Sequence, residues 1–127
     1  MSKQILVIDD EEAVRKAFLL ALEDSGYEIT TVDAGRKGIE AVKNGHFDLI
    51  FLDLRMPGFN GVQTLRGIRE VNRDVPVYIV TAFHKDFMVE LKSASEEGIQ
   101  FELAEKPVAS DQIVGIAKGV FGEIVES

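Results

Sequence analysis

The chain alternates short apolar runs with longer helix-like segments from one end to the other. Runs rich in aliphatic and β-branched residues predict strands, and apolar residues that recur every three or four positions predict helices. The predicted strands are Gln4–Ile8, Glu28–Val32, Asp48–Leu52, Val75–Val80 and Phe101–Ala104. The predicted helices are Glu12–Ser25, Arg36–Asn44, Val62–Val71, Asp86–Glu97 and Ser110–Val125. This strict alternation predicts an α/β fold, with a parallel sheet, right-handed crossovers and helices on both faces.

A five-stranded sheet of this kind favours the doubly wound strand order 2-1-3-4-5, flanked by five helices. Ile5–Ile8 and Leu49–Leu52 are apolar throughout, as is typical of parallel strands that are buried on both faces. In the predicted order these two strands are neighbours. Ligands of such sheets bind outside the carboxyl ends of the strands, so we expect the functional residues to follow the strands directly.

Acidic residues follow both of these central strands. Asp9 and Asp10 come after the first, and Asp53 comes after the third. Carboxylates brought together raise one another's pKa unless a cation joins them, and oxygen ligands without His or Cys suit Mg²⁺. The alternative is that Asp9 or Asp10 caps the first helix and that Asp53 is a turn residue. The three acids together favour a Mg²⁺ site for phosphate chemistry.

Two further strand ends complete the predicted pocket. The fourth strand is followed by Thr81-Ala82, and the fifth by Lys106-Pro107. A hydroxyl and an ammonium group at the same edge could hold a transferred phosphoryl group from two sides. The alternatives are a threonine that satisfies a strand-end backbone group and a solvated loop lysine. The turn from Asp53 to Gly58 is rich in proline and glycine and could direct backbone carbonyls toward the metal.

Composition sets the remaining limits. The chain has 127 residues, which suits one domain, and its net charge of -8 argues against nucleic acid or anionic membrane as a general partner. It has no cysteine, so disulfides are excluded, as fits a reducing cytosol. The first residues lack the apolar stretch of a signal peptide, and no apolar run approaches the roughly 20 residues of a membrane helix. We expect a cytoplasmic protein.

With these motifs the chain resembles the receiver domain of two-component response regulators, over essentially all of residues 3–125. The resemblance rests on motifs that stand in the family's order at the predicted strand ends: Asp9-Asp10, Asp53 with Met56-Pro57-Gly58 and Gly61, Thr81-Ala82, and Lys106-Pro107. It implies a flavodoxin-like fold. It also implies a single receiver domain over residues 1–127, with no output domain after the last helix.

The resemblance assigns a role to each site residue. It implies that Asp53 accepts a phosphoryl group from a kinase phosphohistidine. Mg²⁺ would be held by Asp10, Asp53 and the backbone carbonyl of Arg55, with Asp9 close by. The phosphoryl oxygens would be contacted by Lys106, by the Thr81 hydroxyl and by the backbone N–H of Ala82.

As a member of this family the protein would be a switch and not a metabolic enzyme, with only self-phosphorylation and slow autodephosphorylation. Its partners would be a sensor histidine kinase or a histidine phosphotransfer protein, docking around Val14–Ala21 and Val108–Asp111, and a downstream effector protein. The effector would bind the face formed by the fourth helix, the fifth strand and the fifth helix. We expect no nucleic-acid contact, no membrane insertion, and a monomer or weak homodimer.

One position departs from the family pattern. Receivers usually carry Tyr or Phe three residues before the lysine, as a rotamer switch, whereas this chain has Leu103 there and Phe101 two residues earlier. The stretch from Gly98 to Lys106 is also one residue longer than usual, which predicts a bulge or a longer turn. The sequence leaves open which residue, if either, acts as the switch.

Two other classes of protein share features with this predicted site. A Mg²⁺-dependent phosphatase with Asp53 as nucleophile commonly has a second acid two residues further on, where this chain has Arg55. A flavodoxin-like electron carrier shares the fold class, but its Ser/Thr/Gly phosphate loop is missing after the first strand. The phosphatase is the stronger of the two alternatives.

Overall fold

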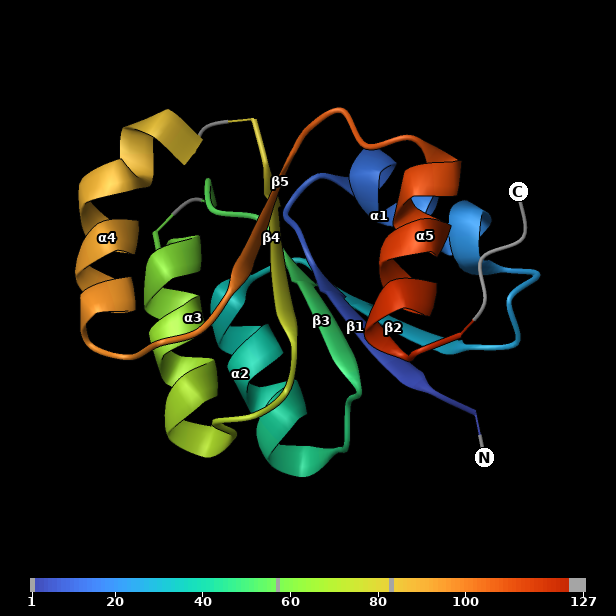
Figure 1. Cartoon of the computed structure of the whole chain (residues 1–127), viewed down its shortest axis with the longest axis horizontal. Helices are drawn as coiled ribbons and strands as arrows, with labels where there is room; N and C mark the ends of the chain where they lie inside the picture. The colour runs from blue at the N-terminus through green and yellow to red at the C-terminus, as the bar shows by residue number, and fades with distance from the viewer. Residues whose placement is uncertain (1, 57, 83, 124–127) are drawn as a thin grey trace.

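The structure, a computed structural model, describes residues 2–56, 58–82 and 84–123. Within these residues it has one five-stranded parallel sheet of order β2-β1-β3-β4-β5 (Figure 1). The strands are β1 (Gln4–Ile8), β2 (Glu28–Val32), β3 (Leu49–Leu52), β4 (Val77–Thr81) and β5 (Glu102–Glu105). The helices are α1 (Glu12–Leu22), α2 (Gly35–Asn44), α3 (Gly61–Val71), α4 (Met88–Glu96) and α5 (Ser110–Val120), with a 3₁₀ turn, His84–Phe87, before α4. The predicted doubly wound fold is confirmed.

Helices cover both faces of the sheet, with α1 and α5 on one side and α2, α3 and α4 on the other (Figure 1). Alternate strand residues therefore enter two separate apolar cores. The core on the α2–α3–α4 side includes Leu6, Ile8, Ile50, Leu52, Leu65, Ile79 and Leu91. The core on the α1–α5 side includes Ile5, Val7, Phe18, Leu22, Phe51, Ile113 and Ala117. Because β1 and β3 contribute to both cores, their apolar residues are all buried, as their composition predicts.

The register of the central strands brings the acidic residues together. Ile8 of β1 is paired with Leu52 of β3, and the Asp53 N–H donates to the Ile8 carbonyl oxygen at 3.0 Å. Asp9 and Asp53 each follow one of these paired residues, so they leave the sheet side by side. On the other side of β1, the Asp9 N–H donates to the Val32 carbonyl oxygen at 3.2 Å. Backbone pairing thus extends to the first residue after each strand.

Several element ends differ from the predictions. β4 starts at Val77 and not at Val75, because Pro76 has no N–H to donate to the ladder. The first helix ends at Leu22, where both the N–H and the hydroxyl of Ser25 bond to the Leu22 carbonyl oxygen. The last helix ends at Val120, since Gly122 takes a left-handed conformation with φ +69°. Residues 124–127, which include the predicted end of this helix at Val125, lie outside the described residues.

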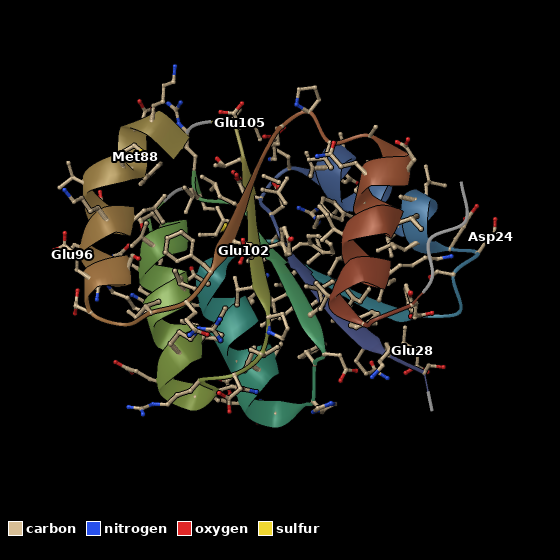
Figure 2. All side chains as sticks on the ribbon, viewed as in Figure 1. Asp24, Glu28, Met88, Glu96, Glu102 and Glu105 are labelled. Atoms are coloured by element: carbon tan, nitrogen blue, oxygen red, sulfur yellow. The ribbon has the colours of Figure 1, made fainter. Side chains whose placement is uncertain are left out.

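The described helices are all too short or too polar to cross a membrane. Figure 2 shows that charged side chains mark the outer parts of the fold, among them Asp24 after α1 and Glu96 near the end of α4.

Candidate functional site

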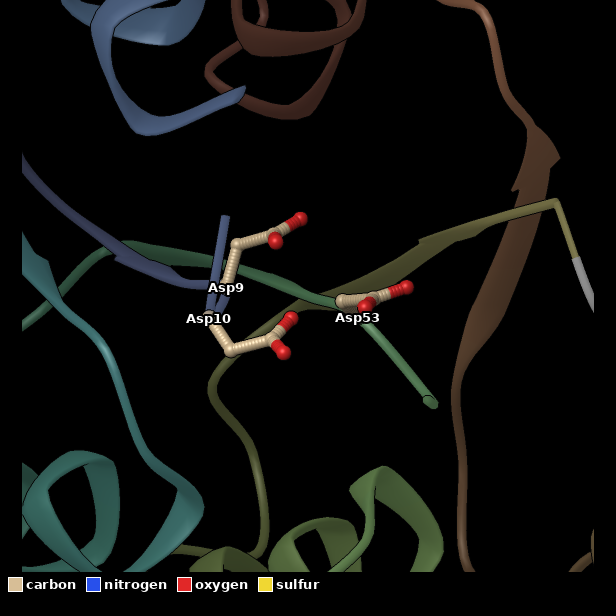
Figure 3. Close-up of side chains that lie close together, drawn as sticks. All are labelled: Asp9, Asp10 and Asp53. Atoms are coloured by element: carbon tan, nitrogen blue, oxygen red, sulfur yellow. The ribbon is translucent and has the colours of Figure 1, made fainter. Parts of the chain in front are cut away.

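Three carboxylates gather where β1 and β3 end. Among the described residues, Asp9, Asp10 and Asp53 form the one group of acids whose potential ligand atoms all lie within 4.8 Å of one another. Figure 3 shows the side chains of Asp9 and Asp10 at the end of β1 beside that of Asp53 at the end of β3. Asp9 and Asp53 are buried, and Asp10 is more exposed. The predicted acidic pocket is therefore formed.

Asp53 is a buried acid with an unsatisfied oxygen atom and a raised pKa. Asp53 is only 4% exposed, and its Oδ1 atom has no hydrogen-bond partner among the described residues. Burial, and after it the charge of Asp9, raise the pKa of Asp53 to about 6, although Lys106 and a hydrogen bond with Thr81 oppose the rise. A buried carboxylate with a free oxygen is an unfavourable arrangement unless a ligand completes it.

Lys106 supplies the positive charge of the pocket. Its Nζ donates to Asp9 Oδ2 at 2.8 Å and lies 3.5 Å from Asp53 Oδ1, within ion-pair distance. Burial lowers the pKa of Lys106, but the hydrogen bond to Asp9 and the charges of Asp53, Asp9 and Glu11 outweigh it, so the pKa is raised. Lys106 is therefore charged at neutral pH. Its side chain is only 16% exposed, which rules out the solvated loop lysine.

The β4–β5 pairing places the remaining predicted residues. Thr81, the last residue of β4, is fully buried and paired with Glu105. Its carbonyl oxygen accepts from the Lys106 N–H at 3.1 Å. Ala82 follows directly and is exposed, as is the Arg55 side chain on the loop after β3. The roles of the Ala82 N–H and the Arg55 carbonyl stay predictions. Pro57, in the same loop, lies outside the described residues.

The loop after Asp53 is closed by a tight backbone contact. The Gly61 N–H donates to the Leu54 carbonyl oxygen at 2.8 Å. A Cβ atom at Gly61 would lie 2.3 Å from the Asp53 carbonyl oxygen, so only glycine fits here. α3 then starts with a capping box, in which Asn60 and Gln63 each accept a hydrogen bond from the other's backbone N–H. The loop is thereby fixed at both ends.

The capping alternative for the aspartates is not what the structure shows. Glu11 is the N-cap residue of α1, and its side chain makes no cap hydrogen bond. Asp9 does accept a backbone hydrogen bond, from the Glu11 N–H to Oδ1 at 3.0 Å, while its Oδ2 holds Lys106. Asp9 thus organises the turn and the charge of the pocket together.

Sequence analysis missed two residues beside this site. Glu11 approaches Lys106 with an Oε1–Nζ distance of 4.0 Å. Arg15 donates from Nη1 to the Asp9 carbonyl oxygen at 2.8 Å. A cation in the first turns of a helix that follows two acids is a signal that could have identified Arg15.

The structure also places the two candidates for an aromatic switch. Leu103 lies on β5 opposite Ile79 and is 39% exposed. Phe101 comes just before β5, is partly buried, and packs against the core on the α2–α3–α4 side. Residues 102–105 pair with residues 78–81 without interruption. The predicted bulge is therefore absent from this pairing, and the longer turn stays a prediction.

The donor set fits Mg²⁺. Three carboxylates from two adjacent strand ends supply hard oxygen ligands, and the Oδ1 atom of Asp53 has no hydrogen-bond partner among the described residues. The acids leave the pocket with more negative charge than Lys106 alone can neutralise. A divalent cation would correct this imbalance.

Known sequences match this chain along most of its length. Residues 5–118 match a family model described as the response regulator receiver domain. YkoG, an uncharacterized transcriptional regulatory protein of Bacillus subtilis, is 36% identical over 78 residues, covering 61% of this chain and 34% of that protein. Response regulator MprA of Mycolicibacterium vanbaalenii is 28% identical over 114 residues, covering 90% and 48%. The chain thus spans about half, or less, of the length of these relatives.

Solved structures share the fold. A CheY-like receiver domain protein from Methanospirillum hungatei superposes with a TM-score of 0.83 at 22% identity, covering 96% of each chain. The receiver domain of the sensor histidine kinase PA1611 from Pseudomonas aeruginosa gives a TM-score of 0.78 at 22% identity, covering 97% of this chain and all of that one. That structure has a magnesium ion coordinated in its active site cleft. At this level of identity the likeness concerns the fold alone.

Proposed function

Because the chain belongs to the response regulator receiver family of two-component systems, we propose that it is a phosphoacceptor switch in which Asp53 accepts the phosphoryl group. One observation carries this assignment: the buried Asp53 carboxylate has a free Oδ1 atom 3.5 Å from the Lys106 ammonium and lies beside Asp9 and Asp10. A carboxylate oxygen that lacks a hydrogen-bond partner and lies beside a cationic group is suited to act as the nucleophile in phosphoryl transfer.

The residues divide the chemistry among them. An Asp53 carboxylate oxygen forms a bond to phosphorus as the phosphorus–nitrogen bond of a phosphohistidine breaks, and the leaving imidazole keeps the electron pair. With a pKa of about 6, Asp53 is mostly ionised at pH 7.5, as nucleophilic attack requires. Lys106 neutralises charge on the phosphoryl oxygens, and the Thr81 hydroxyl and the Ala82 N–H donate hydrogen bonds to them.

The metal would be held by Asp10, Asp53 and the Arg55 carbonyl, with Asp9 close by. When bound, Mg²⁺ supplies positive charge that offsets the acids and the incoming phosphoryl oxygens. Asp9 is paired with Lys106 in the structure, and this pair places the ammonium at the edge of the pocket.

Phosphorylation would act on the α4–β5–α5 face through Thr81. The new group brings up to about two negative charges and strong acceptor oxygens, which attract the Thr81 hydroxyl. Thr81 is joined to Glu105 of β5 by strand pairing and leads into the 3₁₀ turn before α4. Movement at this residue would therefore reach two of the three elements of the effector face, β5 and α4, in the manner of a two-state switch.

The partners follow from the family. The phosphoryl donor would be a sensor histidine kinase or a histidine phosphotransfer protein, and an effector protein would read the result. An apolar hollow of about 430 Å³ beside the site supports docking of the donor. Its lining includes Val14, Phe18, Pro107, Val108 and Ile113, from α1, α5 and the loop before α5.

The test is incubation with Mg²⁺ and acetyl phosphate, followed by intact-mass measurement. We expect one added phosphoryl group on the wild type and none on Asp53→Asn. Asp10→Asn should label slowly, because the acceptor remains but a metal ligand is lost. Asp24→Asn, which removes an exposed acid in the turn after α1, is the matched control and should label like the wild type.

The same samples distinguish the phosphatase alternative. A receiver gives stoichiometric labelling that is stable in acid and labile in alkali. Catalytic turnover of small phosphate esters would instead support the Mg²⁺-dependent phosphatase. A full phosphoryl adduct on Asp53→Asn would assign the acceptor to another residue and overturn the proposal.

A further inference from the structure

Arg15 forms a contact with the site that the proposed chemistry does not use. It is in the first turns of α1, and its guanidinium Nη1 donates to the carbonyl oxygen of Asp9 at 2.8 Å. The Arg15 side chain is partly buried, and its backbone N–H donates to the Glu11 carbonyl oxygen at 3.1 Å. One residue therefore connects the helix to the turn that carries two of the three acids.

This contact fixes one of the two peptide groups that flank Asp10. The Asp9 carbonyl belongs to the peptide that joins Asp9 to Asp10, and Arg15 holds it. The Glu11 N–H belongs to the peptide that joins Asp10 to Glu11, and it donates to Asp9 Oδ1 at 3.0 Å. With both planar peptides held, little backbone freedom remains at Asp10.

Asp10 needs this support more than the other two acids do. Asp9 and Asp53 are buried, and the N–H of each bonds to a neighbouring strand. Asp10 is more exposed and lies beyond the strand pairing, so packing constrains it less. Its carboxylate position therefore depends mainly on the orientation of its own backbone.

We propose that Arg15 is a positioning residue of the Mg²⁺ site, which holds the Asp9–Asp10 peptide so that the Asp10 carboxylate points at the metal. The inference rests on the proposed function, since it takes the three acids as the Mg²⁺ site. Residues that orient metal ligands typically change metal affinity by about 10- to 100-fold when they are replaced.

The sign of the effect separates positioning from simple electrostatics. A guanidinium group near the site repels a divalent cation, so electrostatics alone predicts that removing Arg15 tightens Mg²⁺ binding. Positioning predicts the reverse, because a loosened Asp10 is a poorer ligand. The two effects oppose each other, and the measured direction shows which one dominates.

The experiment is a calorimetric titration of the metal-free protein with Mg²⁺. Arg15→Met keeps the apolar stem but loses the donor and the charge, and we expect about tenfold weaker binding. Arg15→Lys should recover part of the loss, since an ammonium group can donate to the same carbonyl. Lys16→Met, which removes a neighbouring but exposed cation paired with Glu12, should bind no more weakly than the wild type.

A second measurement needs no metal. In the metal-free protein, amide hydrogen exchange at Glu11 should be faster in Arg15→Met than in the wild type, because the turn is less firmly held. Exchange at Asp53, whose N–H is bonded to Ile8, should be unchanged, and this shows that the variant is folded. If Arg15→Met unfolds, amide exchange will be faster at both Glu11 and Asp53. In that case the Mg²⁺ titration of Arg15→Lys tests the positioning role.

The outcomes distinguish the two hypotheses. If the wild type binds no Mg²⁺, the proposed metal site and this inference are both overturned. If the wild type binds Mg²⁺ and Arg15→Met binds it equally or more tightly, only the positioning role is overturned. Weaker binding by Arg15→Met, with partial recovery in Arg15→Lys, supports the role.

Discussion

Lys106 and Asp9, which are 97 residues apart in the sequence, form a hydrogen-bonded ion pair of 2.8 Å at the carboxyl edge of the sheet. The pair joins the end of β1 to the loop after β5, which are separated by β3 and β4. It keeps the ammonium beside Asp53, with Nζ 3.5 Å from Asp53 Oδ1. If Asp53 accepts a phosphoryl group, as we propose, the positive charge is already in place before the transfer.

Replacing Lys106 with Met should destabilise the metal-free protein at neutral pH. The variant leaves Asp9 and Asp53 buried without their cation, and breaking a buried pair costs about 3 kcal/mol of unfolding free energy. The loss should be smaller at pH 5, because Asp53 is then mostly protonated. Urea denaturation at both pH values, with a chelator present, measures this. An equal loss at both values would show that Asp53 ionisation is not involved.

Replacing Asp53 with Asn should stabilise the metal-free protein above pH 6. Burial and the charge of Asp9 raise the pKa of Asp53 to about 6 from its ordinary 3.8, so ionisation disfavours the folded state. Below pH 3.8 Asp53 is protonated in both the folded and the unfolded protein, so its ionisation does not affect the unfolding free energy. Between pH 3.8 and 6 the destabilisation of the wild type by this ionisation grows, and above pH 6 it has its full value. We expect a gain of about 1–3 kcal/mol at pH 7.5.

Urea denaturation of the wild type and Asp53→Asn from pH 4 to 8 measures this gain. Mg²⁺ is the internal control, since it should stabilise the wild type more than the variant and so reduce the gap. A gap that is constant across the pH range would assign the effect to something other than the carboxylate charge.

Replacing Gly61 with Ala should damage both stability and phosphorylation. The new Cβ would lie 2.3 Å from the Asp53 carbonyl oxygen and 2.4 Å from the Leu54 Cα, and neither backbone atom can rotate away. We expect a loss of about 1–3 kcal/mol and slower labelling by acetyl phosphate, because the nucleophile's backbone must shift. Labelling at the wild-type rate would show that Asp53 tolerates the shift.

The matched control is Gly115→Ala. A Cβ at this position in α5 meets no atom within 4 Å, so the variant should be as stable as the wild type or more stable by about 0.5–1 kcal/mol. Its labelling rate should not change.

Replacing Arg69 with Met should loosen the connection between α3 and the turn before β5. The Arg69 guanidinium donates to three backbone carbonyl oxygens, those of Asn72, Val75 and Gln100, at 2.6–3.3 Å. Its removal takes a donor from the part-buried Asn72 and Val75 carbonyls, whereas the exposed Gln100 carbonyl can bond to water, so we expect a cost of about 2 kcal/mol. Arg66→Met, which removes only the exposed pair with Glu97, is the control and should have a smaller effect that fades with added salt.

Hydrogen exchange locates the damage. Amides in the turn at residues 97–101 should exchange faster in Arg69→Met, while those of β1 should not. Uniformly faster exchange would instead indicate a global loss of stability.

The strand order and the acidic pocket could be predicted because both depend on local patterns. Two wholly apolar runs identified the central strands, and parallel pairing then brought the residues after them to one edge. Thr81 and Lys106 could be placed in the same way, since Thr81 ends β4 and Lys106 directly follows β5. No long-range contact had to be known for these predictions.

Contacts that cross from one segment to another could not be predicted. A cation near the two acids could have singled out Arg15 as a residue of interest, but its contact with the Asp9 carbonyl oxygen could not be predicted, because hydrophobic periodicity does not encode the direction of a flexible side chain. The burial of Phe101 likewise depends on the length of the turn before β5. A shift of one residue there would move its side chain to the other face of the sheet.

The pairing of Ile8 with Leu52 sets the distance between the two buried acids. Since Asp9 and Asp53 each follow one of these residues, their backbones are separated by the spacing of neighbouring strands, roughly 4.8 Å. Insertions or deletions in the outer loops and helices would leave that spacing unaltered. The outer surface of this architecture can therefore vary in shape and charge while the geometry of the acidic pocket stays the same.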